Sequence, residues 1–206
     1  MPFHLLDDRE LSLAVSRLAK WPAISVKCLS AKECSTLVRM ADQLVYRRAT
    51  PVTGYKAAVY QDFELDYAIP PRHCFWNLAR SLREIIQRVL RQQACEVGLV
   101  TRYTINDLIA QRYPPGCHGI SAHRDHIAYE AVVAILLLSG DGDFRIHSDR
   151  EELEARTVPF NPGELLLMGA PGIAPGFKRP FHSVGNITRM RRTIGLRYDS
   201  RVSVPR

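Results

Sequence analysis

Two imidazoles and one carboxylate in this chain have the residue types and spacing of a metal site. His123 and Asp125 are separated by one residue, and on extended backbone such residues project to the same face. A second imidazole, His182, lies in Phe181-His182-Ser183-Val184, which reads as a separate strand. Two histidines and a carboxylate form the facial set of non-haem iron(II). The competing interpretation is an ordinary surface or core role for His123, because a His-x-Asp pair is common by chance.

A basic strand is predicted to begin nine residues beyond His182. Alternation over residues 191–197 would give this strand two different faces. The polar face would consist of Arg191, Thr193, Gly195 and Arg197. The other face would be mainly apolar, with Ile194 and Leu196 beside Arg192. The apolar face would pack on helices, and the polar face would meet a ligand. Arginine offers a planar fork that matches a carboxylate. A solvated basic edge strand is the alternative, which explains the arginines but not the glycine and the aliphatics.

Together these features resemble the iron(II)- and 2-oxoglutarate-dependent oxygenases. Within that superfamily, three segments are similar to the AlkB-like nucleic-acid dealkylases: Gln111-Arg112-Tyr113-Pro114-Pro115-Gly116, then His123-Arg124-Asp125, and the Arg-x5-Arg of residues 191–197. The likeness covers about residues 105–200, roughly half of the chain. The short interval from His182 to Arg191 is closer to that of other hydroxylases of the superfamily.

The resemblance implies a fold, a metal and two cosubstrates. The fold would be α+β, with a double-stranded β-helix (jelly-roll) core and N-terminal helices packed on one sheet. Iron(II) would be bound by His123, Asp125 and His182, and 2-oxoglutarate and dioxygen would be the cosubstrates. The residues implied to surround the far carboxylate of 2-oxoglutarate are Arg191, Tyr113, Thr193, Arg197 and Gln111. Decarboxylation to succinate and CO2 would accompany hydroxylation of a substrate C–H bond, and a hydroxylated N-methyl group would leave as formaldehyde.

The elements that must position these residues divide the chain into a helical first part and a strand-rich second part. Ser30 and Glu33 form a capping box that predicts a helix over residues 31–47, and apolar spacing predicts further helices over 8–20 and 70–93. Short strands are predicted at 97–104, 107–113, 131–138, 143–147, 164–168 and 192–198. We therefore expect one compact domain, with helical support and a lid in residues 1–96 and the oxygenase core in 97–206. The lid candidate is the segment 49–67, read as loop with some strand.

Composition favours a soluble, cytoplasmic protein with an anionic partner. The 206 residues carry a net charge of +7, and 46% of them are apolar, enough to bury a core. The longest apolar run, residues 131–138, is too short to cross a membrane, and acidic residues occupy the place of a secretory leader. The five cysteines form no CxxC motif, which predicts reduced thiols and no cysteine-based metal site.

The substrate is predicted less directly than the chemistry. Six basic residues near the C-terminus could track a phosphate backbone or could form a solubilising surface: Lys178, Arg179, Arg189, Arg192, Arg201 and Arg206. His126, three residues after His123, is expected to be structural or to face the substrate. The leading hypothesis is AlkB-like oxidative demethylation of nucleic acid or a nucleotide. The alternatives are a hydroxylase of a small molecule or amino acid, a hydroxylase of a protein side chain, and a non-catalytic metal-binding sandwich.

Overall fold

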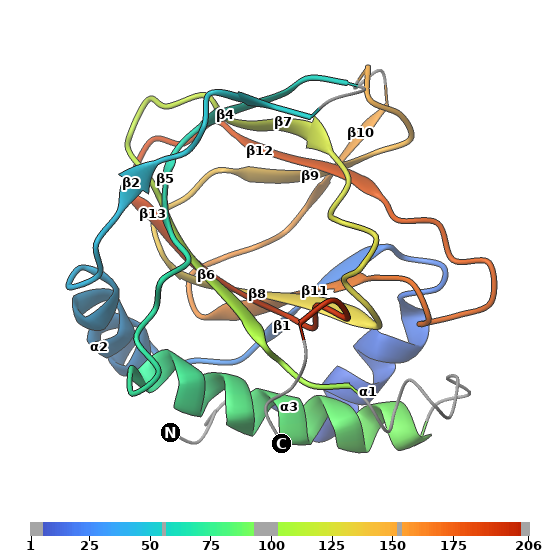
Figure 1. Ribbon diagram of the computed structural model, residues 1–206. Helices are drawn as coiled ribbons and strands as arrows, with labels where there is room; N and C mark the ends of the chain where they lie inside the picture. Colours follow the sequence, from blue (N-terminus) through green and yellow to red (C-terminus); the bar gives the residue numbers. More distant parts are fainter. Residues whose placement is uncertain (1–5, 55–56, 93–102, 152–153, 203–206) are drawn as a thin grey trace.

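In the computed structural model, two antiparallel β-sheets lie face to face, and three helices cover the outer face of the larger sheet (Figure 1). The structure describes residues 6–54, 57–92, 103–151 and 154–202. The helices are α1 (Asp8–Arg17), α2 (Ala31–Ala41) and α3 (Cys74–Gln92). The seven-stranded sheet has the order β1 (Ala23–Lys27), β11 (Glu164–Gly169), β8 (Val132–Ser139), β13 (Arg191–Arg197), β6 (Asp107–Tyr113), β5 (Glu64–Asp66) and β2 (Arg47–Arg48). The six-stranded sheet has the order β10 (Ala155–Val158), β9 (Asp143–His147), β12 (Phe181–Gly185), β7 (Gly119–His123), β4 (Val59–Asp62) and β3 (Val52–Thr53).

The helices form where capping residues and apolar faces coincide. The predicted capping box is present at α2, where the Ser30 side chain accepts from the backbone of Glu33 and the Glu33 carboxylate accepts from the backbone of Ser30. This helix ends at Ala41, short of the predicted residue 47. The apolar spacing continues beyond Ala41, but it no longer marks a buried face, because Val45 is 84% exposed. The third helix begins at Cys74 rather than at residue 70.

The central strand β8 is apolar throughout because both of its faces are buried. The side chains that pack against the helices are Val132, Ala134, Leu136 and Leu138. The side chains that pack between the two sheets are Val133, Ile135 and Leu137. The same alternation in β13 places Ile194 and Leu196 against the helices. The predicted two-faced character of that strand is therefore confirmed, and its polar face is turned toward the space between the sheets.

The expected α+β class, with N-terminal helices packed on one sheet, is confirmed. The strands predicted at 107–113 and 143–147 have the expected bounds, and those at 131–138, 164–168 and 192–198 are shifted or extended by one residue. The strand predicted at 97–104 lies largely outside the described residues. The first part of the chain contributes strands as well as helices, because β1, β2 and β5 join the larger sheet while β3 and β4 join the smaller. Within the described part of the chain, no helix is both long and apolar enough to span a bilayer.

Candidate metal centre and anion patch

A cavity of about 280 Å³ opens between the two sheets. All eight residues that the sequence singled out line it: His123, Asp125, His182, Arg191, Tyr113, Thr193, Arg197 and Gln111. They come from β6, β7, β12, β13 and the segment after β7. Segments that are about 80 residues apart in the chain thus deliver their polar side chains to one cavity.

His123, Asp125 and His182 form the one cluster of potential metal ligands found among the described residues. Their ligand atoms all lie within 4.8 Å of one another, so small side-chain rotations would bring the three to a single ion. Nε2 of His182 is 3.9 Å from Oδ1 of Asp125, and the two imidazole centroids are 4.2 Å apart. The donor set of two nitrogens and one oxygen suits iron(II) and leaves the remaining coordination positions free for other ligands.

A register shift between β7 and β12 aims His123 into the cavity. His182 is opposite His123, but Val184 is opposite Ile120, so three residue steps on β7 match two on β12. This irregularity, a β-bulge, lets Ile120 and His123 both line the cavity although strict alternation would place them on opposite faces. The pairing also places the two imidazoles directly across from each other.

Neighbouring groups fix both imidazoles. Nδ1 of His123 lies 2.9 Å from the carbonyl oxygen of Ser121, and as a donor to that carbonyl it leaves Nε2 with its lone pair free. Phe144 stacks on the ring of His182 at 5.5 Å between centroids. Burial lowers the pKa of His182 to about 4, and His123 acts in the same direction. His182 is therefore neutral near pH 7, as a metal ligand must be.

The second half of the site is an anion patch, defined as Arg191, Tyr113, Thr193 and Gln111. Strands β13 and β6 pair so that Arg191 is opposite Tyr113 and Thr193 is opposite Gln111. The Thr193 hydroxyl donates to Oε1 of Gln111 at 3.2 Å. Burial raises the pKa of the Tyr113 phenol, which keeps it protonated and able to donate, although Arg191 acts in the opposite direction. The patch therefore presents a cation and hydroxyl groups to one end of the cavity.

Arg191 is a buried cation without a carboxylate partner among the described residues. Its side chain is 1% exposed, and its Nη1 donates to the carbonyl oxygens of Asp141 and Gly142 at 3.1 and 3.3 Å. Its Nε has no hydrogen-bond partner. Gly140 permits this arrangement, since with φ at +84° a Cβ there would lie 2.6 Å or less from three backbone atoms of Met190 and Arg191. A desolvated, unpaired charge is costly, so this position favours an anionic ligand.

Arg197 lines the same cavity but lies six residues from Arg191, at the other end of β13, where it is opposite Asp107. Its Nη2 is 2.7 Å from Oδ2 of Asp107. At about 3.4 Å per residue, the Cα atoms of the two arginines are separated by about 20 Å. The two arginines therefore enter the same cavity from opposite ends of β13.

Sequence reasoning did not identify the tyrosines and the acid around Arg197. The Arg197 guanidinium lies over the ring of Tyr129 at 4.6 Å and over that of Tyr67 at 5.5 Å. The signal for Asp107 was present, because the first residue of a predicted strand can pair with the last residue of its antiparallel neighbour. His126 lines the cavity too, and its Nδ1 accepts from the backbone of Ala128 at 3.1 Å, in agreement with the structural or substrate-facing role expected for it.

Comparison with known proteins gives similarity at the level of structure. No protein-family model and no curated protein sequence matches this chain. Solved structures do share the fold, and three of them are described here. A prolyl hydroxylase from Trichoplax adhaerens, in complex with an oxygen-degradation-domain peptide fragment of hypoxia inducible factor, has a TM-score of 0.63 and 16% identity, covering 94% of this chain and 91% of that one.

The other two structures are bacterial. A Pseudomonas putida prolyl-4-hydroxylase has a TM-score of 0.64 and 16% identity, with 92% of this chain and 98% of that chain covered. A 2OG-Fe(II) oxygenase family oxidoreductase from Burkholderia pseudomallei has a TM-score of 0.62 and 12% identity, with coverage of 95% and 91%. At these identities the likeness shows the fold: the chain is a double-stranded β-helix of the kind found in 2OG-Fe(II) oxygenases.

Proposed function

We propose that this protein is an iron(II)- and 2-oxoglutarate-dependent dioxygenase. The observation that carries the proposal is the pairing, within one cavity, of a His-Asp-His cluster with a buried arginine that has no carboxylate partner among the described residues. The cluster suits iron(II), and the arginine suits one end of a dianion. 2-Oxoglutarate is such a dianion, and its two carboxylates would be divided between the metal and Arg191. The double-stranded β-helix fold supports the same assignment.

The residues fit these groups, and each has a definable part in the reaction. His123, Asp125 and His182 would hold the iron, which supplies activation of dioxygen when it is bound together with 2-oxoglutarate. Arg191 would pair with the far carboxylate, and Tyr113 and Thr193 would donate hydrogen bonds to it. Apolar side chains between the sheets, among them Phe144 and Val184, would limit the access of water to the metal.

Hydroxylation is the favoured outcome on the substrate. Two of the similar structures named above are prolyl hydroxylases, and one of them is in complex with a peptide fragment. The interval of nine residues from His182 to Arg191 agrees with this assignment, as the sequence comparison with other hydroxylases suggested. Oxidative demethylation of nucleic acid, the leading hypothesis from sequence, becomes the second candidate.

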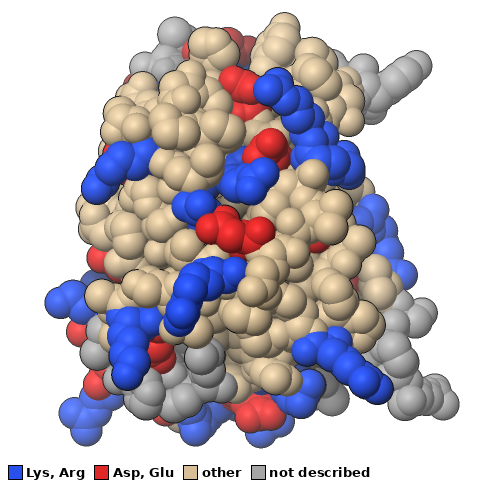
Figure 2. All heavy atoms as spheres, turned by 90° about the vertical axis from the view of Figure 1, so that its left-hand side faces the viewer, with Lys and Arg blue, Asp and Glu red and all other residues tan. Residues whose placement is uncertain are grey.

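The basic residues near the C-terminus do not favour nucleic acid. Four of the six are engaged within the protein: Arg179 donates to the backbone carbonyl of Asp125, and Arg189, Arg192 and Arg201 form ion pairs with Asp141, Asp42 and Asp199. Arg206 lies outside the described residues. On the face shown in Figure 2, basic side chains are spread over the surface with acidic side chains among them. Among these six residues, a phosphate backbone would find few unpaired cations to contact.

An anaerobic titration tests the proposal. Iron(II) and 2-oxoglutarate should together give a charge-transfer absorption band that saturates at one equivalent of each. In air, the loaded protein should release succinate from 2-oxoglutarate, slowly alone and faster with a substrate. A chain that binds iron(II) but shows no band with 2-oxoglutarate would contradict the proposal, and so would one whose His182→Ala variant binds both as well as the parent.

A further inference from the structure

We propose that the substrate is an acidic segment of a polypeptide, whose carboxylates bind a rim cluster of three arginines, defined as Arg124, Arg150 and Arg179. The inference rests on the proposed dioxygenase function, because it names the substrate class of that site. The cluster surrounds residues 122–125, the segment that contains two of the three metal-ligand candidates. An acidic side chain bound there would anchor the chain while a neighbouring residue enters the cavity.

Each arginine of the rim cluster is attached to this segment without a carboxylate. Arg124 belongs to the segment itself. Arg150 donates through Nη1 to the carbonyl oxygen of Ala122 at 3.3 Å, and Arg179 donates to the carbonyl oxygen of Asp125. None of the three forms an ion pair with an acidic residue in the part of the chain that the structure describes. Hydrogen bonds to carbonyl groups hold the guanidinium groups in place but leave their charge uncompensated.

Two of these guanidinium groups share one aromatic ring. Cζ of Arg124 lies 4.0 Å from the ring centroid of Phe181, and Cζ of Arg150 lies 5.3 Å from it. The two Cζ atoms are therefore at most about 9 Å apart, and like charges at that separation repel each other. A carboxylate bound beside them would relieve this repulsion and match the planar fork of an arginine. Arg124 is exposed, so its fork is open to a ligand.

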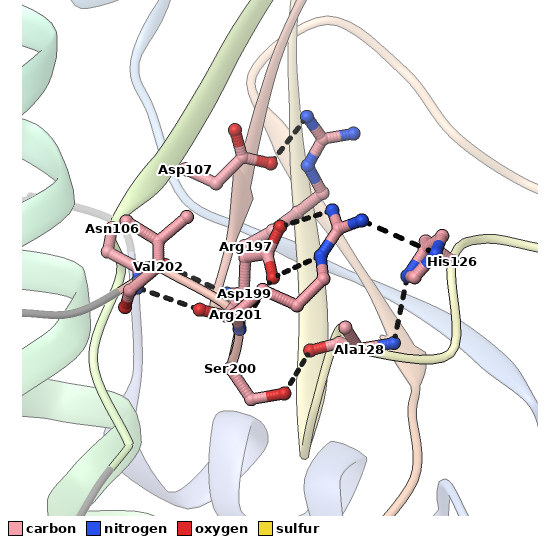
Figure 3. A network of polar contacts seen from close by, with 9 residues as sticks. All are labelled: Asn106, Asp107, His126, Ala128, Arg197, Asp199, Ser200, Arg201 and Val202. Atoms are coloured by element: carbon pink, nitrogen blue, oxygen red, sulfur yellow. Dashed lines mark hydrogen bonds and ion pairs between the residues drawn. The ribbon is translucent and has the colours of Figure 1, made fainter.

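Arginines of the C-terminal part of the chain provide the contrast, because they are neutralised within the protein (Figure 3). Nη2 of Arg197 is 2.7 Å from Oδ2 of Asp107. Arg201 donates to Asp199 through Nε at 3.0 Å and through Nη2 at 2.6 Å. Each of these guanidinium groups has a carboxylate beside it, whereas the rim cluster has carbonyl groups and an aromatic ring.

The charges within the cavity leave its rim positive. Three of the described arginines line the cavity, and two of them are accounted for. Arg191 would be paired with 2-oxoglutarate, and Arg197 is paired with Asp107. Arg124 is left, while Asp125, the acidic residue of the cavity lining, would be used by the metal. An approaching chain therefore meets a positive rim, which attracts acidic segments and repels basic ones.

The position of Phe181 indicates a polypeptide and not a small acid. On β12, His182 lines the cavity and Phe181 does not, as expected for consecutive residues of a strand. Arg124 thus passes from the cavity edge to a ring on the outer side of the sheet. An extended chain advances about 3.4 Å per residue, so an acidic residue about three positions from the reacting one would reach this ring. A free amino acid is too short to occupy both places.

The size of the rim cluster favours a peptide over a nucleic acid. Its three arginines lie around the end of one strand, β7, and suit one or two carboxylates. A nucleic acid presents its phosphates in a regular row, and binding them takes a matching row of cations.

Peptide pools test the inference on the parent chain. Three pools of decapeptides have random central positions and flanks made of Asp and Glu, of Asn and Gln, or of Lys and Arg. With iron(II) and 2-oxoglutarate, the acidic pool should raise succinate release about fivefold or more above the amide pool, and the basic pool should not raise it. Because exposed charges are screened by salt, this difference should shrink as NaCl rises from about 0.05 to about 0.5 M.

Variants locate the charge preference, with binding as a readout that needs no turnover. The fluorescein-labelled pools are titrated with the Mn(II)- and 2-oxoglutarate-loaded protein, and anisotropy is measured. Arg124→Met should weaken binding of the acidic pool about fivefold and leave that of the amide pool unchanged. Arg124→Glu should reverse the preference, so that the basic pool binds more tightly than the acidic one.

Arg88→Met is the matched control. Arg88 is an exposed arginine of α3, in the helical layer on the other sheet, and its removal changes the net charge equally. This variant should keep the preference of the parent. Equal losses for Arg88→Met and Arg124→Met would show an effect of net charge alone and would overturn the role of the rim cluster. The comparison of pools on the parent chain stands even if an Arg124 variant does not fold.

Two failures are distinguishable. If iron(II) and 2-oxoglutarate do not bind, the proposed function is wrong and this inference falls with it. If they bind, but the acidic pool is no better than the amide pool in either assay, the acidic substrate is wrong and the rim cluster is structural. Stimulation of succinate release by free amino acids or by a single-stranded oligonucleotide, with none by the acidic pool, would likewise overturn the inference while leaving the dioxygenase intact.

Discussion

Replacement of Arg191 by methionine should weaken 2-oxoglutarate binding severely while the protein stays folded. The side chain is 1% exposed, and in the ligand-free protein its contacts at Nη1 are two carbonyl oxygens. With 2-oxoglutarate bound, removal of the cation would leave a desolvated carboxylate without its partner. Breaking a buried ion pair in this way costs about 3–5 kcal/mol. At about 1.4 kcal/mol per tenfold, the dissociation constant should rise about 100- to 4,000-fold.

The assay is the anaerobic absorbance titration of the iron(II)-loaded protein with 2-oxoglutarate. Arg191→Lys should give an intermediate loss, because lysine keeps the charge but lacks the planar fork. Arg192→Met makes the same substitution one residue along β13, on the face that pairs with Asp42, and should leave the affinity unchanged. An affinity within threefold of the parent for Arg191→Met would refute the assignment. A larger loss for Arg192→Met would move the role to that residue.

Three further predictions concern the metal, pH and salt. His182→Ala should reduce bound iron(II) from one equivalent to less than a tenth, measured by elemental analysis after desalting. Asp141→Asn should lower the melting temperature at pH 7, because hydrogen bonds from Thr188 and Arg189 lower the pKa of this carboxyl well below its usual 3.8. Such stability is fully present above that value and is lost as the pH falls toward the lowered pKa, so the two melting temperatures should begin to approach each other only below about pH 4. Oligonucleotide affinity should vary little with salt concentration. Each phosphate contacted in a single strand would contribute a slope of about −0.7 in log K against log salt, and a total slope of −2 or steeper would restore the nucleic-acid hypothesis.

The parts of the fold that local sequence determines were predictable. The capping box at Ser30 and the spacing of apolar residues mark the helices, because these signals depend on neighbours within one or two turns. Most strands from residue 107 onward were found for a similar reason, since alternation and flanking turn residues are local, but β7 and β10 were not predicted. The short strands β2, β3 and β5 carry too few residues for a pattern, and their pairing partners supply their regularity instead.

The site was predictable where one strand carries several of its members. Alternation along residues 191–197 separates Arg191 and Thr193 from Ile194, and the structure has this separation. The grouping of His182 with His123 came instead from the chemistry of the donor set and from a resemblance, because nothing in the local pattern gives the register between β12 and β7. The β-bulge in β7 illustrates the limit: alternation alone would have put Ile120 and His123 on opposite faces, whereas both line the cavity.

Arg197 shows how a correct face can lead to an incomplete role. Its position on the polar face of β13 follows from counting residues, and counting also gives its distance from Arg191. The partner that determines its role, Asp107, is 90 residues earlier and becomes its neighbour through the antiparallel pairing of β6 with β13. Two buried arginines on the same face therefore differ, because Arg197 has a carboxylate opposite it and Arg191 has a phenol. That difference separates a buried cation that has no carboxylate partner among the described residues from one whose charge is already paired within the protein.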